Sequence, residues 1–139
     1  GLPKDEDLLE DHKDKPIDSL LGHVPREEYI SLSESYMKPR YGKDIFGRVF
    51  VNHLKYLELY PEERTCLVPD SGFTEEAKAI VDHLGPTNVK LIRIHRKGTD
   101  FSNDSRSYID LEGVLTFDLQ NDGTLQELTE DVRRLLKLI

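Results

Sequence analysis

The sequence predicts an α/β fold, in which a parallel sheet has flanking helices and the N-terminal half is helical. In the second half, short runs of branched apolar residues alternate with helical patterns, as in parallel strands joined by helices. In the first half, apolar residues recur at three- and four-residue steps, which indicates amphipathic helices. A chain of 139 residues has the length of one domain, so we expect residues 1–139 to form a single α/β domain.

The first half contains two predicted helices that follow a charged arm. Residues 1–19 carry seven acidic and three basic residues, which indicates an exposed acidic arm or a short solvated helix. Pro25, followed shortly by two glutamates, predicts the start of a helix that ends before Pro39. A second helix is predicted over 44–60, because its apolar residues share one face and Pro61 ends it.

The second half contains three predicted strands and two predicted helices. The strands are the branched apolar runs over 65–68, 89–94 and 114–119. A helix is predicted over 74–84, and a capping box from Thr124 to Glu127 begins the last helix. Cys66 lies inside the first run, so we expect this thiol to be buried and unsuited to nucleophilic chemistry.

Composition excludes several classes of protein. The net charge of −8 disfavours a duplex-DNA binder, which needs an excess of basic residues. A single cysteine excludes an internal disulfide, and the five histidines show no paired ligand spacing, so we expect no metal site. No apolar run reaches the roughly 18 residues of a membrane helix and no signal segment begins the chain, so we expect a cytoplasmic protein without membrane contact.

Two windows reverse the overall negative charge. Residues 38–55 have five basic residues against one acidic residue, and residues 88–109 have five against two. Arginine forks match phosphate oxygens, so these windows indicate a pocket for an anionic ligand, with solvated surface faces as the alternative. We expect Arg26, Arg40, Arg96 and Arg106 to converge on one crevice near Asp70.

Asp70 is the strongest candidate for chemistry. It follows the predicted strand over 65–68, where a carboxylate would point into the crevice at the carboxyl end of a parallel sheet. There it could hold a hydrated Mg²⁺ or receive a ligand hydroxyl. The alternative is that Asp70 or Ser71 caps the helix over 74–84. His95, at the end of a strand beside Arg96, is the one histidine of interest.

Several short segments occur in a particular order along the chain. They are 13–16 (KDKP), 22–27 (GHVPRE), 33–34 (SE), 38–47 (KPRYGKDIFG), 69–73 (PDSGF), 103–108 (NDSRSY) and 121–125 (NDGTL). Their order and spacing resemble bacteriophage deoxynucleoside monophosphate kinases, a family of P-loop kinases, over most of residues 13–136. The resemblance implies a remnant of that three-layer fold and a nucleotide as ligand, with bound Mg²⁺ accompanying the nucleotide.

The resemblance also implies roles for individual residues. Asp70 would stand in the catalytic position for Mg²⁺ or the acceptor hydroxyl. The implied nucleotide-binding residues are Arg26 at the acceptor monophosphate; Glu34, Lys38 and Arg40 near its base or phosphate; Phe73 in the switch after Asp70; and Arg93, Arg96 and Arg106 on the phosphates from the lid side.

One element of the family has no counterpart in these residues. Phosphoryl transfer in P-loop kinases needs G-x-x-x-x-G-K-[ST] to hold the donor phosphates, and neither Gly42-Lys43 nor Gly47-Arg48 completes it. The sequence also begins at Gly1 with its one methionine at Met37, so we expect a removed tag or preceding sequence.

Three functions follow from this departure. The first is a non-catalytic nucleotide-binding protein that in a phage would sequester a nucleotide, including a nucleotide immune signal of the host, in the host cytoplasm. The second is a fragment of an active kinase whose P-loop lies upstream. The third is an interaction domain without a small ligand. The missing P-loop strand would leave unpaired strand edges, which favours a homodimer unless the strands over 65–68 and 89–94 pair directly.

Overall fold

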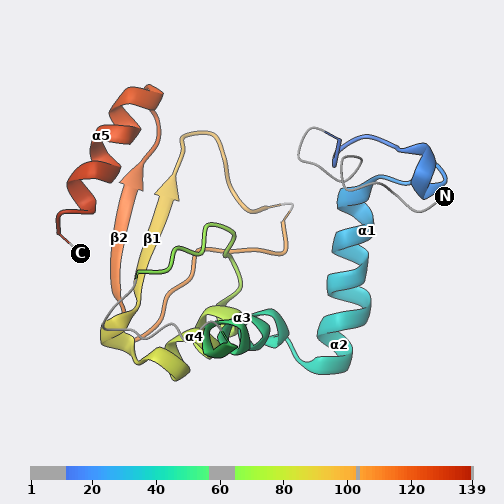
Figure 1. Ribbon diagram of the computed structural model, residues 1–139. Coiled ribbons are helices and arrows are strands. Elements are labelled where there is room, and N and C mark those ends of the chain that lie inside the picture. The colour runs from blue at the N-terminus through green and yellow to red at the C-terminus, as the bar shows by residue number, and fades with distance from the viewer. Residues whose placement is uncertain (1–11, 57–64, 103, 139) are drawn as a thin grey trace. The chain divides into compact units, whose positions relative to one another are not determined.

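The computed structural model describes residues 12–56, 65–102 and 104–138 (Figure 1). They belong to two compact units, residues 1–45 and 46–139. Most of the predicted arm over 1–19 lies outside the described residues. The described remainder of the arm ends in a short 3-10 helix, η2 (Asp18–Leu20).

The first unit contains one long helix built from three consecutive segments. These are α1 (Pro25–Ser31), the π-helical segment η3 (Leu32–Met37) and α2 (Lys38–Tyr41). Pro25 occupies the first turn, as predicted. The prediction that this helix ends before Pro39 is wrong, since the helix continues to Tyr41.

The π-helical segment accounts for that difference. The backbone N–H of Lys38 donates to the carbonyl of Ser33, five residues back. A proline inside a regular α-helix lacks a donor and crowds the carbonyl four residues back. The wider π turn immediately before Pro39 relieves this crowding, so the helix can pass through the proline.

The second unit contains three helices of the predicted kind. The helix α3 (Ile45–Tyr56) begins one residue later than predicted, and the predicted residues 57–60 lie outside the described chain. The helix α4 (Thr74–Leu84) has the predicted bounds and is followed by the 3-10 helix η4 (Pro86–Asn88). The helix α5 (Leu125–Leu135) begins with the predicted capping box, in which Thr124 and Glu127 each accept the other's backbone N–H.

The sheet consists of two parallel strands, β1 (Lys90–His95) and β2 (Leu115–Gln120). Their register pairs Lys90 with Leu115 and His95 with Gln120. Helix α5 lies beside β2, on the side away from β1 (Figure 1). The predicted α/β class and parallel pairing are therefore confirmed, with strand bounds one residue later than predicted.

The predicted strand over 65–68 is wrong. Residues 65–69 form no strand and make no backbone hydrogen bond with other described residues. Leu67 is 77% exposed, and Cys66 is exposed where we expected a buried thiol. An apolar run becomes a strand only when a neighbour supplies a ladder of hydrogen bonds, and none of the described residues supplies one here.

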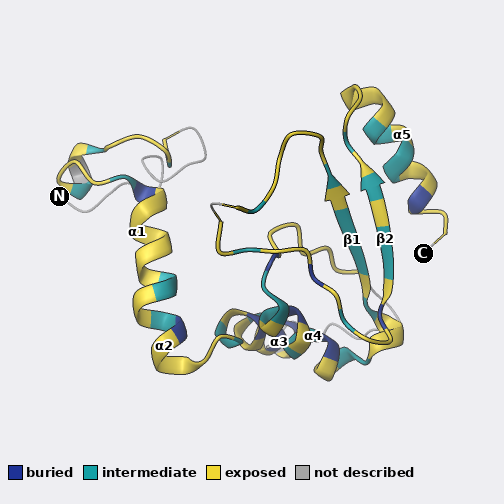
Figure 2. Ribbon diagram, turned by 180° about the vertical axis from the view of Figure 1, so that it is seen from behind, coloured by how far each residue is buried: buried dark blue, intermediate teal, exposed yellow. Residues whose placement is uncertain are grey.

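The core of the second unit lies mainly between its helices and the base of the sheet (Figure 2). Its buried apolar side chains are Val51, Leu54, Ala77, Val81, Ile109, Val114 and Leu135. Helices α3 and α4 approach closely at Gly47, where a Cβ atom would lie 2.3 Å from the backbone oxygen of Glu76. In the described ranges, no helix has the length and apolarity to cross a membrane.

Candidate functional site

Two loops of the second unit meet at Gly72. The backbone N–H of Ser107 donates to the carbonyl of Gly72 at 2.9 Å. The side chain of Arg106 crosses Gly72 so closely that a Cβ atom there would lie 2.8 Å from the Cβ of Arg106. Gly72 thus allows the loop after residue 69 to sit directly against the loop that carries Arg106.

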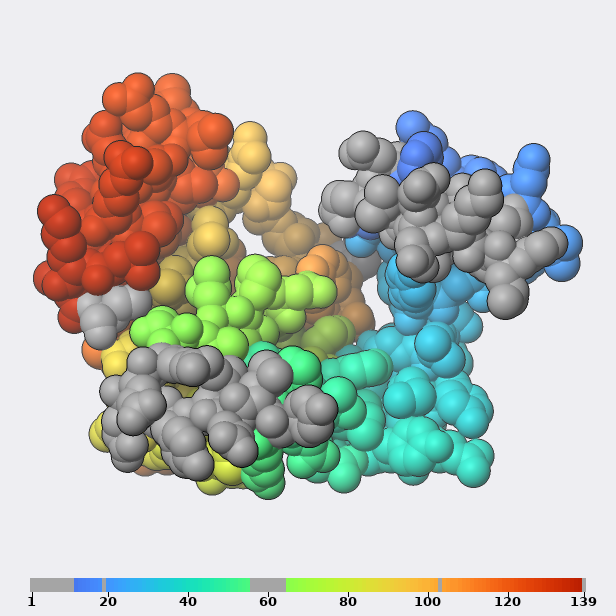
Figure 3. Space-filling model, viewed as in Figure 1, coloured from blue at the N-terminus to red at the C-terminus, as the bar shows by residue number. Residues whose placement is uncertain are grey.

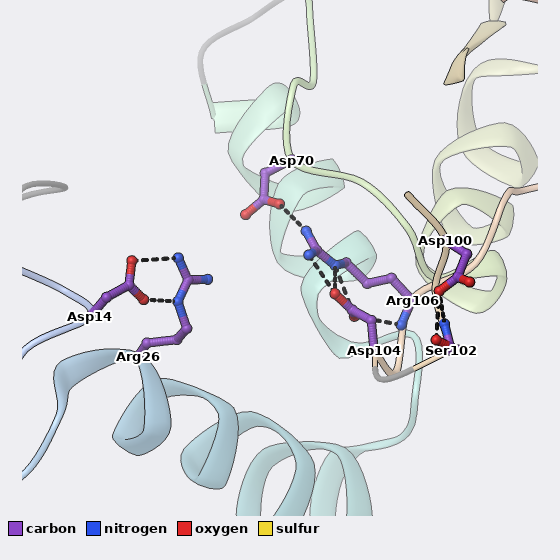
Figure 4. A network of polar contacts seen from close by, with 7 residues as sticks. All are labelled: Asp14, Arg26, Asp70, Asp100, Ser102, Asp104 and Arg106. Atoms are coloured by element: carbon purple, nitrogen blue, oxygen red, sulfur yellow. Dashed lines mark hydrogen bonds and ion pairs between the residues drawn. The ribbon is translucent and has the colours of Figure 1, made fainter. Parts of the chain in front are cut away.

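Two carboxylates contact the guanidinium group of Arg106 from different sides (Figure 4). Asp104 accepts hydrogen bonds from Nε at 3.0 Å and from Nη2 at 2.6 Å, a fork-to-fork pair. The Asp70 carboxylate lies 3.8 Å from Nη1, which is an ion pair beyond hydrogen-bond distance. Asp104 also accepts the backbone N–H of Arg106, so it fixes both the loop and the side chain.

The electrostatic surroundings keep Arg106 cationic. Hydrogen bonding to Asp104, followed by the charges of Asp104 and Asp70, raises the pKa of Arg106 above its ordinary value. With one edge of the guanidinium group held by Asp104, the Nη1 edge faces the Asp70 loop. This edge makes no hydrogen bond with the described residues.

Asp70 does not cap the helix that follows it. The N-cap of α4 is Phe73, a half-buried residue with no capping hydrogen bond from its side chain. The capping alternative for Asp70 and Ser71 is therefore wrong. The side chain of Asp70 is 93% exposed and has Arg106 as its charged neighbour.

The residues around Asp70 do not fit a protein-built Mg²⁺ site. In the described part of the chain, no group of three histidine, cysteine or acidic side chains could hold a metal ion. Arg106, the charged neighbour of Asp70 among the described residues, would repel a cation. The described residues thus provide no site for the Mg²⁺ that the family resemblance implies.

Other polar contacts stabilise loops of the second unit. Ser102 donates its side-chain and backbone hydrogens to Asp100, and these hydrogen bonds lower the pKa of that carboxyl (Figure 4). The backbone N–H of Lys97 donates to Asp122 at 2.5 Å, so the turn after β1 is tied to the turn after β2.

A second polar cluster lies across the two strands. Nε2 of His95 is 2.5 Å from Oδ1 of Asp118, and the ring of His95 lies 4.5 Å from that of Tyr108. Arg93 lies opposite Asp118 in the register and 3.7 Å from Asp110. Two carboxylates therefore offset the charge of Arg93, which makes this cluster a cross-strand connection and a poor anion site.

The predicted residues of the first unit contact one another or their neighbours. Arg26 pairs with Asp14 through two hydrogen bonds, and this contact lowers the pKa of Asp14 (Figure 4). The buried Lys38 donates to Glu34 at 2.8 Å. The guanidinium carbon of Arg40 lies 5.8 Å from the ring centres of both Tyr36 and Tyr41.

Of the predicted site residues, Asp70 and Arg106 lie together. Arg93 is engaged at the strands, and Arg96 is exposed in the turn after β1. The convergence of Arg26 and Arg40 with Arg96 and Arg106 on one crevice stays a prediction. Asp104 is a site residue that the sequence analysis did not identify. Its position two residues before Arg106, in the same loop, is the feature that could have identified it.

Gly47 does not belong to a phosphate-binding loop. It is a buried residue of α3, two residues into the helix, and packs against α4. A P-loop needs its glycines in a turn before a helix, where backbone N–H groups point at phosphate. The segment from Gly42 to Arg48 therefore lacks the sequence of that element, and of its two glycines Gly42 lies in the turn before α3 whereas Gly47 lies inside the helix.

Comparison of the chain with protein-family models, with curated proteins and with solved structures gave no match. The α/β class and the arrangement around Arg106 are therefore the basis for a functional proposal.

Proposed function

We propose that this chain binds a nucleotide or another phosphate-bearing small molecule and does not transfer phosphate. The observation that carries the proposal is the orientation of Arg106. Asp104 holds one edge of its guanidinium group, and the Nη1 edge, which makes no hydrogen bond in the described chain, faces the loop of Asp70. An arginine fixed in this way loses little side-chain entropy when it binds an anion.

A phosphate group is the ligand that best fits the Nη1 edge of this arginine. Its oxygens accept the parallel hydrogen bonds that a guanidinium group donates. The contact between Nη1 and Asp70 is long at 3.8 Å, and Asp70 is almost fully exposed, so a phosphate can displace this carboxylate at little cost. Asp70 can then turn toward a ligand hydroxyl, as the family resemblance implies.

We infer the absence of phosphate transfer from the lack of a binding element for the phosphate donor. Positioning a triphosphate requires a backbone cradle and a lysine, and the 139 residues contain no G-x-x-x-x-G-K-[ST] element. A binding protein derived from a kinase of the phage type would act by sequestering its nucleotide. The alternative of an active kinase requires a P-loop segment upstream of Gly1.

Calorimetry with deoxynucleoside monophosphates and dinucleotides tests the proposal. Arg106→Ala should weaken binding by about 1.5 to 3 kcal/mol, the scale of a charge-assisted hydrogen bond. Arg134→Ala is the matched control, because Arg134 is also an exposed arginine paired with an aspartate, Asp131 on α5. Unchanged affinity in Arg106→Ala, or no binding by the wild-type chain, would contradict the proposal.

A turnover assay tests the non-catalytic part separately. The chain mixed with ATP, Mg²⁺ and each deoxynucleoside monophosphate should give no diphosphate above the level without protein. Steady diphosphate production would overturn this part of the proposal and favour the kinase alternative.

A further inference from the structure

Strand β1 has an open edge. It pairs with β2 on one side, and on the other side the described residues form no ladder with it. The edge therefore presents backbone N–H and C=O groups, except at Ile94, whose carbonyl accepts the hydroxyl of Tyr108 at 3.0 Å. A two-stranded sheet is marginal on its own, so an additional strand at this edge would stabilise it.

The same chain carries a segment suited to that edge. Residues 65–69 are rich in apolar side chains and form no backbone hydrogen bond within the described chain. They lie at the surface of their unit, where they are drawn in light green in Figure 3. Leu67 is 77% exposed, although leucine is a residue type that favours burial. Its sequence neighbours Cys66 and Val68 favour burial as well.

Charge decides which strand suits the edge. Residues 88–97, which include β1, contain four basic and no acidic residues. Pairing this edge with the same edge of a second copy would therefore place like charges opposite each other. Residues 65–77 contain three acidic and no basic residues, so this segment is complementary to the β1 edge.

A parallel arrangement brings those charges together. The carboxyl ends of parallel strands meet at the same edge of a sheet. A segment over 65–69 added parallel to β1 would therefore place the following Asp70 near Arg96 and Lys97, which follow β1. Neither basic side chain forms an ion pair with another described residue.

We propose that two copies of this chain exchange the segments 65–69, each adding as a parallel strand to the open β1 edge of the other. The exchange is reciprocal, so it closes at a dimer and extends each sheet from two strands to three. It satisfies backbone groups on both the donor segment and the acceptor edge. The proposal does not depend on the ligand of Arg106, but it replaces the long ion pair of Asp70 with Arg106 by contacts with Arg96 and Lys97 of the other copy.

Light scattering of the full chain at micromolar concentrations tests the assembly. The wild type should have the mass of a dimer. Leu67→Pro removes a backbone donor from the added strand and should raise the dimer dissociation constant about tenfold or more. Leu125→Pro is the matched control, since Leu125 is 79% exposed and stands at the first position of α5, where proline is tolerated. A wild-type monomer, or equal dissociation constants in both variants, would overturn the proposal.

Cross-linking tests the pairing itself. A strand that places Asp70 beside Arg96 places Cys66, the one cysteine of the chain, beside Ile92 on β1. Ile92→Cys should form disulfide-linked dimers under mild oxidation, whereas Ile92→Cys combined with Cys66→Ser should form markedly fewer. A disulfide formed only within one chain would show that the segment pairs with its own β1, which refutes the exchange.

Discussion

The close approach of α3 and α4 makes Gly47→Ala an informative substitution. The new Cβ atom would lie 2.3 Å from the backbone oxygen of Glu76 and 2.9 Å from its carbonyl carbon. Ordinary contact begins near 3.4 Å, so the two helices would have to separate by about 1 Å. Because the clashing atoms are backbone, no side-chain rotation relieves the overlap, and a cost of up to about 3 kcal/mol is expected.

Helix propensity acts in the opposite direction. Alanine is favoured over glycine inside a helix by about 1 kcal/mol. The expected net effect of Gly47→Ala is therefore a loss of about 2 kcal/mol in the free energy of unfolding. For a chain of this length, that loss corresponds to a fall in Tm of about 8 °C.

Urea denaturation followed by circular dichroism measures this effect. Asn52→Ala is the control, because Asn52 is exposed on the same helix and gains helix propensity without a new close contact. This control should be as stable as the wild type or slightly more stable. If Gly47→Ala proved as stable as Asn52→Ala, the packing of α3 against α4 at this point would be refuted.

Three further predictions concern the loops and α5. Gly72→Ala should displace the side chain of Arg106, since the added methyl would lie 2.8 Å from its Cβ, and should weaken nucleotide binding about tenfold by calorimetry; unchanged affinity would contradict this. Thr124→Ala should cost about 1 kcal/mol of stability by loss of the cap, measured by urea denaturation. Hydrogen bonds from Thr124 lower the pKa of Glu127, so its stabilising effect is present above the ordinary carboxyl pKa and is lost as pH falls through the lowered one. Glu127→Gln should remove this acid dependence, and an unchanged profile in that variant would argue against the capping box.

Local signals account for the elements that the sequence predicted well. Helix α5 follows from the capping box of Thr124 and Glu127, and α4 ends at Gly85, which adopts a φ of 85° that side chains disfavour. Pro39 misled the prediction because the π turn before it is a feature of the backbone that no residue type specifies.

The site could be predicted only in part, for the same reason. The sequence predicts Asp70 at the end of a strand that does not form and Arg106 in a basic loop, and the two residues do lie together. Asp104 acts through the local geometry of its own loop, and Asp118 through the strand register that places it opposite Arg93. A register is a long-range property of two strands, so a single sequence does not reveal it.

The apolar composition of strands β1 and β2 does not match their exposure to solvent. A run such as Leu91-Ile92-Arg93-Ile94 is typical of a parallel strand covered on both faces. Yet Ile94 is 50% exposed, and Leu115 on β2 is 54% exposed. Branched apolar residues stabilise a fold only when they leave water, so these strands have the composition of a larger sheet than the described residues form. A strand added at the β1 edge would lie beside Ile94 and shield part of its side chain, which is an argument for assembly that is independent of the charges along β1.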